Sequence, residues 1–242
     1  MPRTRVRITL ALLAAFFLAV SCSVRQTLVV KADGSGTLAM RVEITKVLHD
    51  YIMSLAEVAG QNDLLSSGKL FNTKDIQKGF ESQPGVTVKR IETPKPDVLE
   101  VDLAYASIRE VFAKGDAAKS AGAIAYGESG GKKTLKLHLD RTNYKQLATV
   151  FPLLANPLFE GMGPQANDTI SDDEYMEMIR FSLGDEGPGL LKKSFIDLTI
   201  KPEGEILSQT GGTPTNGGVL FRIPLLRLLI LDKPLDYSVT YR

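Results

Sequence analysis

The stretch RQTLVVKADGSGTLAMRVEI, residues 25–44, decides the fold that we expect for this chain. Apolar and polar side chains alternate on both sides of the turn DGSG, residues 33–36. The apolar positions are Leu28, Val30, Leu38, Met40, Val42 and Ile44. A period of two on either side of a glycine-containing turn predicts a β-hairpin with one buried face.

Two more strand pairs are expected downstream, over residues 86–91 with 98–105 and over residues 123–126 with 134–140. The last part of the chain alternates in the same way over residues 195–201, 205–210, 219–223 and 236–241. Each of these segments is short and is bounded by glycine, proline or aspartate, as strands of an antiparallel sheet usually are. The chain is therefore expected to be rich in β-structure.

Helices are expected between the strand pairs. Apolar residues recur at helical spacing over residues 45–60 and 73–82, and again at Tyr144, Leu147 and Phe151. Two Ser-x-x-Glu capping boxes, Ser107 with Glu110 and Ser171 with Glu174, predict two further helix starts. Together the patterns predict an α+β fold: a mostly antiparallel sheet built from strand pairs, with helices packed on one face.

The first 22 residues indicate where the protein is located. Arg3, Arg5 and Arg7 precede an apolar run, residues 8–20, in which Thr9 alone is polar. A positive segment followed by such a run is typical of a secretory signal, because the run is shorter than the ~20 residues that span a bilayer. It ends at Cys22, the chain's only cysteine. This ending resembles the lipobox of bacterial lipoproteins, which implies that residues 1–21 are removed and that Cys22 receives a diacylglyceryl group.

We therefore divide the chain into a lipoprotein signal peptide, residues 1–21, and one α+β envelope domain, residues 22–242. Two residues separate Cys22 from the first expected strand, so the domain begins about 10 Å from its lipid. At ~0.8 kcal/mol per buried methylene, two or three acyl chains make a permanent anchor. The expected location is the cell membrane or outer membrane, facing the periplasm or the exterior. The alternative is a secreted protein that is cut after Ser21 and keeps a free thiol.

Composition excludes several classes of protein. Removal of three arginines lowers Lys plus Arg from 29 to 26 against 28 acidic residues, which gives a formal charge of −2 and no basic footprint for nucleic acid. A single cysteine supports neither a disulfide framework nor a thiolate metal site. We expect no cofactor, no metal and no nucleic-acid partner.

The motifs that suggest catalysis have simpler explanations. Residues 127–131, GESGG, fit the G-x-S-x-G pattern of a hydrolase, but a strand is expected after Ser129 where a nucleophile elbow needs a helix. Residues 130–134 resemble a P-loop but lack its first glycine, its Ser or Thr after the lysine, and its helix. His138 is expected on the polar side of a strand, and His49 on the solvated side of a helix. We therefore expect that the protein is not an enzyme.

Two apolar stretches have irregular patterns. Residues 151–162 set Leu154, Leu158, Phe159 and Met162 among prolines and glycines, which is typical of an adaptable lid or an apolar pocket. The alternative is that these side chains complete the core. Residues 219–231 are too short to span a bilayer, and either form a buried strand and helical turn or dip into the membrane interface.

Both ends of the chain resemble the LppM-type lipoprotein domain. The residues concerned are the cysteine with its following strand and DGSG turn, and near the other end the KPEG turn at residues 201–204, Gly211-Gly212 and the apolar residues 221–231. The resemblance implies an α+β module that binds lipid or glycolipid. We accordingly expect a lipid-anchored envelope protein that binds a lipid or another apolar envelope ligand. The alternative is a structural or surface-exposed scaffold that pairs with an envelope protein.

Overall fold

The computed structural model describes residues 22–58, 60, 62–114, 123–145, 163–164 and 170–242. In these ranges eleven strands form two sheets. The first sheet has seven strands in the order β3 (Val86–Lys95), β4 (Val98–Tyr105), β2 (Gly36–Glu43), β1 (Ser23–Val30), β7 (Phe195–Pro202), β10 (Gly218–Pro224), β9 (Thr213–Thr215). The second has four, in the order β5 (Ile124–Ser129), β6 (Lys132–Leu139), β11 (Leu235–Tyr241), β8 (Ile206–Thr210).

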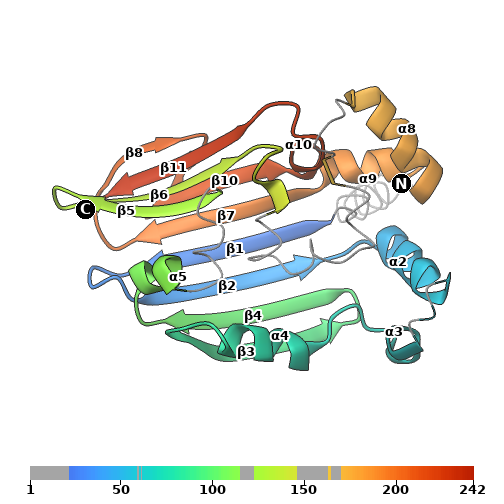
Figure 1. Ribbon diagram of the computed structural model, residues 1–242, viewed down its shortest axis with the longest axis horizontal. Coiled ribbons are helices and arrows are strands. Elements are labelled where there is room, and N and C mark those ends of the chain that lie inside the picture. Colours follow the sequence, from blue (N-terminus) through green and yellow to red (C-terminus); the bar gives the residue numbers. More distant parts are fainter. Residues whose placement is uncertain (1–21, 59, 61, 115–122, 146–162, 165–169) are drawn as a thin grey trace, which may run out of the picture.

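The expected fold class, α+β with mostly antiparallel strands, is confirmed. Neighbouring strands run antiparallel throughout both sheets except for the central pair of β1 and β7, which is parallel. Among the described residues there are seven helices: α2 (Lys46–Val58), α3 (Asn62–Ser67), α4 (Thr73–Glu81), α5 (Ile108–Lys114), α8 (Asp172–Leu183), α9 (Gly187–Lys193) and α10 (Leu225–Ile230). The helices and the four-stranded sheet are arranged around the seven-stranded sheet (Figure 1).

The hairpin expected from residues 25–44 is formed by β1 and β2, with Leu28 opposite Leu38. The Asp33 carboxylate accepts a hydrogen bond from the Ser35 amide (2.8 Å), which fixes the turn. The turn ends at Gly36, where the chain has no room for a side chain: a Cβ would lie 2.0 Å from the Val29 carbonyl oxygen. The glycine at this position therefore permits the close approach of the two strands.

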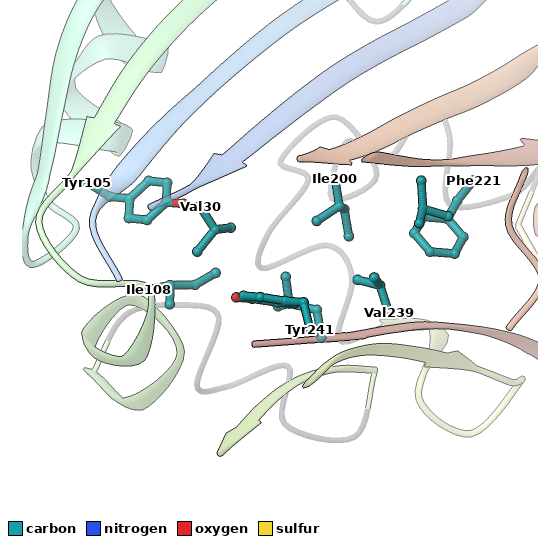
Figure 2. Packing of buried hydrophobic residues seen from close by; sticks show 9 residues of the cluster. Val30, Tyr105, Ile108, Ile200, Phe221, Val239 and Tyr241 are labelled. Atoms are coloured by element: carbon teal, nitrogen blue, oxygen red, sulfur yellow. The ribbon is translucent and has the colours of Figure 1, made fainter. Parts of the chain in front are cut away.

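One face of the seven-stranded sheet is apolar, and two different layers cover it. Over β3 and β4 lies α4, whose Ile76 and Phe80 pack on the cluster around the buried Val101 and Leu103. Over β7 and β10 lies the four-stranded sheet. Figure 2 shows this contact: Val30, Ile200 and Phe221 of the large sheet face Val239 and Tyr241 of the small one, with Ile108 and Tyr105 closing one side.

Helices also gather at the end of the large sheet where β1 and β7 begin (Figure 1). Here α8, α9 and α10 bury a common cluster formed by Tyr175, Met176, Ile179, Leu191, Leu229 and Ile230. The capping box expected at Ser171 and Glu174 is present at the start of α8. At the start of α5 the Ser107 hydroxyl accepts from the Glu110 amide (3.4 Å).

The apolar residues 225–231 belong to the core. Leu228, Leu229, Ile230 and Leu231 are all buried. The Arg227 guanidinium pairs with the carboxylates of Asp172 and Asp232, so it is held at the protein surface. Of the two alternatives for residues 219–231, the buried strand and helical turn is the one observed.

Candidate functional site

Cys22, the expected lipid-attachment residue, lies immediately before β1. Its amide donates a hydrogen bond to the Ser194 hydroxyl (3.1 Å), and its carbonyl oxygen accepts one from the Phe195 amide (3.2 Å). The second bond begins the parallel pairing of β1 with β7, which continues with Ser23 opposite Phe195. The backbone of Cys22 is thus already part of the central strand pair, with no flexible residue between Cys22 and the sheet.

The Cys22 side chain is half-buried against the apolar cluster at this end of the large sheet. Its sulfur lies 3.8 Å from the Thr45 hydroxyl oxygen. Burial raises the pKa of the Cys22 thiol, and hydrogen bonds from Thr45 and Ser194 only partly oppose the effect. Because the thiolate is the reactive form of cysteine, a thiol with a raised pKa is a poor nucleophile at neutral pH.

Two residues that sequence patterns did not single out hold Cys22 in place. Ser194 is 3% exposed, and its hydroxyl also donates to the Leu190 carbonyl oxygen (2.8 Å). Thr45 is buried, and its hydroxyl accepts from the Leu48 amide (3.4 Å) at the start of α2. Each lies at a junction between a helix and a strand: Ser194 between α9 and β7, and Thr45 between β2 and α2. Thr45 caps the start of α2, a role that a threonine just before a helical pattern indicates, whereas no local pattern could have identified Ser194.

On the outer face of the large sheet, close to Cys22, two arginines lie over one aromatic ring. The guanidinium carbons of Arg222 and Arg25 lie 4.3 Å and 5.9 Å from the centre of the Phe195 ring. Arg222 also donates two hydrogen bonds to the buried Asp197 carboxylate (2.8 and 2.7 Å), which raises the pKa of Arg222. Arg25 is exposed and has no ion-pair partner among the described residues.

A shallow hollow of about 260 Å³ lies farther along the same face, where the small side chains of Thr27 and Ala39 are surrounded by longer ones. Its rim includes Arg41, Arg90, Glu100 and Asp102. Arg41 pairs with Glu100, and Arg90 pairs with Asp102 at 2.8 Å. Two of the three arginines that line the hollow are thus paired with carboxylates, and the third, Arg25, is not.

The G-x-S-x-G segment lies in the β5–β6 hairpin, as expected, beside an open hollow of about 530 Å³. Gly130 and Gly131 both have positive φ angles, 56° and 72°, which suit a tight hairpin turn. His138 is not near Ser129, because the His138 amide donates to the Ala123 carbonyl, six residues before Ser129. That separation is about 20 Å along a strand, too far for a general base.

The two histidines have ordinary structural contacts. His138 bonds to the Asp236 carboxylate (2.7 Å), which raises the pKa of His138. His49 was expected to be solvated, but its side chain is only 20% exposed and lies 3.4 Å from the Gly68 carbonyl oxygen. The expectation for His49 was wrong because the chain after α3 folds back onto α2, which periodicity within one helix does not predict. In the described part of the chain no group of three or more His, Cys, Asp or Glu side chains is arranged to hold a metal.

The expected ligand-binding residues Leu154, Leu158, Phe159 and Met162 lie outside the described residues, as does most of the helix expected around Tyr144, Leu147 and Phe151. Within the described ranges, no helix combines the length and apolar character that are needed to cross a membrane.

No family model matches the chain, and no curated protein matches its sequence. Among solved structures, the chain is similar to the folded domain of the Mycobacterium tuberculosis LppM protein, determined by NMR. The two are 11% identical, and the match covers 91% of this chain and 89% of that domain with a TM-score of 0.43. The similarity is distant.

Proposed function

We propose that this chain is a lipid-anchored lipoprotein of the bacterial cell envelope, and that its domain is a binding module for a lipid or another apolar envelope ligand. The placement of Cys22 is the observation that carries the anchoring part. Cys22 ends the lipobox-like segment and is bonded through its backbone to Ser194 and Phe195. A lipid on this residue holds the sheet against the bilayer, because no flexible linker separates Cys22 from β1.

The contacts of Cys22 are compatible with acylation. An acylated α-amino group is an amide and keeps one N–H, so the hydrogen bond to Ser194 is retained after the signal peptide is replaced by a fatty acid. The Cys22 thiol donates to the Thr45 hydroxyl oxygen, 3.8 Å away; a thioether sulfur has no proton to donate but can accept from the same hydroxyl. Both modifications of a lipoprotein cysteine therefore preserve its attachment to the sheet.

Replacing Cys22 by serine tests the anchor. The exported Cys22→Ser protein is expected in the soluble fraction after cell breakage or in the medium, because serine carries no thioether lipid. Ser23→Ala, next to it in β1, is the matched control and is expected to stay with the membranes. Recovery of the Cys22→Ser protein in the membrane fraction, in the amount found for Ser23→Ala, would refute anchoring through this residue.

The ligand part of the proposal is supported by the apolar composition of residues 151–162. The two hollows described above are open and lined mainly by polar side chains, so they do not suit an acyl chain. The test is to extract and identify the lipid that co-purifies with the protein. Phe159→Asp is expected to reduce the lipid recovered per mole of protein severalfold. Phe181→Asp is the matched control, because Phe181 is 94% exposed on α8. Equal lipid recovery from both variants would count against binding at residues 151–162.

A scaffold that pairs through a sheet edge is the alternative, and the edges of the large sheet do not favour it. Edge strand β3 has register shifts between Val88 and Arg90 and between Glu92 and Lys95. The other edge, β9, has three residues, one of them Pro214. Bulges, short length and proline are features that block edge-to-edge pairing. Crosslinking that traps a dimer through β3 would revive the scaffold.

We also propose that the domain is not an enzyme. The support is the separation of Ser129 from His138 along the β5–β6 hairpin. Hydrolysis of a lipid ester that is abolished by Ser129→Ala would contradict this proposal.

A further inference from the structure

We propose that three exposed cations around Cys22, Arg25, Lys192 and Lys193, contact the anionic headgroups of the bilayer. We call these three residues the basic collar. The inference rests on the proposed anchoring through Cys22 and adds to it which surface meets the membrane and which lipid chemistry that surface prefers.

The collar residues lie close to Cys22 because of the hydrogen bonds that hold Cys22. Lys192 and Lys193 form the exposed last turn of α9 and directly precede Ser194, whose hydroxyl accepts from the Cys22 amide at 3.1 Å. Arg25 is the third residue after Cys22 in the chain. At ~3.8 Å between successive Cα atoms, each collar residue lies within about 12–15 Å of Cys22 along the backbone, and its side chain extends from there.

The carboxylates nearest Cys22 do not neutralise these cations. The adjacent carboxylates already have partners: Glu43 pairs with Arg41, Asp50 with Lys46, and Asp197 with Arg222. In the described part of the chain none of the collar residues has a carboxylate partner.

Unpaired carboxylates also occur at this end. Asp97, whose carbonyl oxygen accepts from the Ile44 amide, lies about two strand spacings or ~10 Å from Ser23. Glu57, Asp173 and Glu186 lie on α2, at the start of α8 and at the start of α9, and have no ion-pair partner among the described residues. The positive charge of the collar is therefore local to the residues next to Cys22, where Lys192 and Lys193 adjoin Ser194 and Arg25 follows Cys22.

The collar lies at the end of the molecule that a lipid on Cys22 would hold against the bilayer. The start of β1 and helix α9 lie at the same end of the large sheet, whereas the β5–β6 turn lies at the opposite end (Figure 1). At physiological ionic strength charges interact over a Debye length of about 8 Å. Eight residues of β1 extend about 26 Å, so only charges at the Cys22 end lie within this range of a bilayer that holds Cys22. Phosphate and anionic headgroups are the negative groups found at that depth.

Lysine footprinting of the full lipoprotein tests the collar. The protein, purified from membranes, is reconstituted into vesicles of phosphatidylcholine alone or of phosphatidylcholine with phosphatidylglycerol, and is labelled briefly with an amine-reactive ester before digestion and mass spectrometry. We expect Lys192 and Lys193 to react severalfold more slowly in the phosphatidylglycerol vesicles than in detergent. Lys132, in the β5–β6 turn, is the internal control and should react equally in all three. High salt should restore the rate of Lys192 and Lys193, because it screens the contact.

Two double variants test whether the charge of the collar, and not steric shielding by the membrane, slows the labelling. Lys46, next to Thr45, reports on the same end of the molecule. In Lys192→Gln/Lys193→Gln its labelling in anionic vesicles is expected to rise about twofold, whereas Lys132→Gln/Lys136→Gln leaves it unchanged.

The outcomes for the collar and for the anchor are distinguishable. Equal labelling of Lys192, Lys193 and Lys132 in anionic vesicles, with acylated Cys22 in the same digest, would overturn the collar and leave the anchor intact. An unmodified Cys22 in that digest would overturn the anchor whatever the lysines show.

Discussion

Ser194→Ala tests how firmly Cys22 is tied to the sheet. The substitution removes two hydrogen bonds: the one that Ser194 accepts from the Cys22 amide (3.1 Å) and the one that it donates to the Leu190 carbonyl oxygen (2.8 Å). A typical intramolecular hydrogen bond contributes about 1 kcal/mol, and a buried donor left unpaired costs about 1–3 kcal/mol. Because Ser194 is 3% exposed, water cannot easily replace the lost bonds. We expect a loss of about 2 kcal/mol in the free energy of unfolding.

The assay is thermal unfolding followed by circular dichroism in one detergent. For a chain of this size 1 kcal/mol corresponds to about 2–4 °C in Tm, so Ser194→Ala should unfold about 4–8 °C below the wild type. Ser208→Ala is the matched control, since Ser208 is exposed on β8 and is expected to leave Tm unchanged. Amide exchange should also become faster at Cys22 and Phe195. A Tm within about 1 °C of the Ser208→Ala value, with unchanged exchange at Cys22, would show that the Ser194 hydroxyl does not hold Cys22 to the sheet.

Two further predictions concern the hairpin and the pH response. Gly36→Ala should lower stability by about 2–3 kcal/mol in urea unfolding, because its Cβ would lie 2.0 Å from the Val29 carbonyl oxygen, whereas Gly127→Ala, where a Cβ meets nothing within 4 Å, should have little effect. Equal stability of the two variants would contradict the crowding at Gly36. His138 should titrate above its ordinary pKa of about 6.5 in NMR spectra, because the Asp236 carboxylate stabilises the protonated ring. The stability that this pair contributes is present below pH ~6.5 and is lost as pH rises through the folded-state pKa; an unaltered midpoint in Asp236→Asn would show that the pair is not responsible.

The features that local patterns predict are those held by local contacts. The β1–β2 hairpin, helix α4 and the capped start of α8 each depend on residues close together in sequence, and the structure confirms them. Helix α9 was not predicted, because its first three residues are Gly187, Pro188 and Gly189, which are poor helix formers except for proline in the first turn.

The arrangement of the strands could not be predicted because it depends on distant pairings. Residues 172 positions apart, Cys22 and Ser194, meet where β1 joins β7, and periodicity gives no information on such a partner. The same holds for the assignment of β5 and β6 to a second sheet with β11. Gln26 shows the limit within one strand: it occupies an apolar-face position and is buried, and its side-chain amide donates to the Met40 sulfur (3.4 Å).

Only part of the candidate site could be predicted from the sequence, because the rest depends on contacts between distant residues. Cys22 is identified by the residues that precede it, which form a local signal. The support from Thr45 and Ser194, and the gathering of Arg25 with Lys192 and Lys193, exist only after the chain folds. The gathering of cations around Cys22 is therefore a property of the fold, and the formal charge of the whole chain does not reveal it.

Mass spectrometry of the mature amino terminus shows directly whether Cys22 is lipidated. We predict that the membrane-bound protein begins at Cys22 and that the amino-terminal peptide carries the mass of a diacylglyceryl group on sulfur, resistant to thiol alkylation. A mature protein that is free in the medium, with a Cys22 thiol that iodoacetamide alkylates after unfolding, would contradict it.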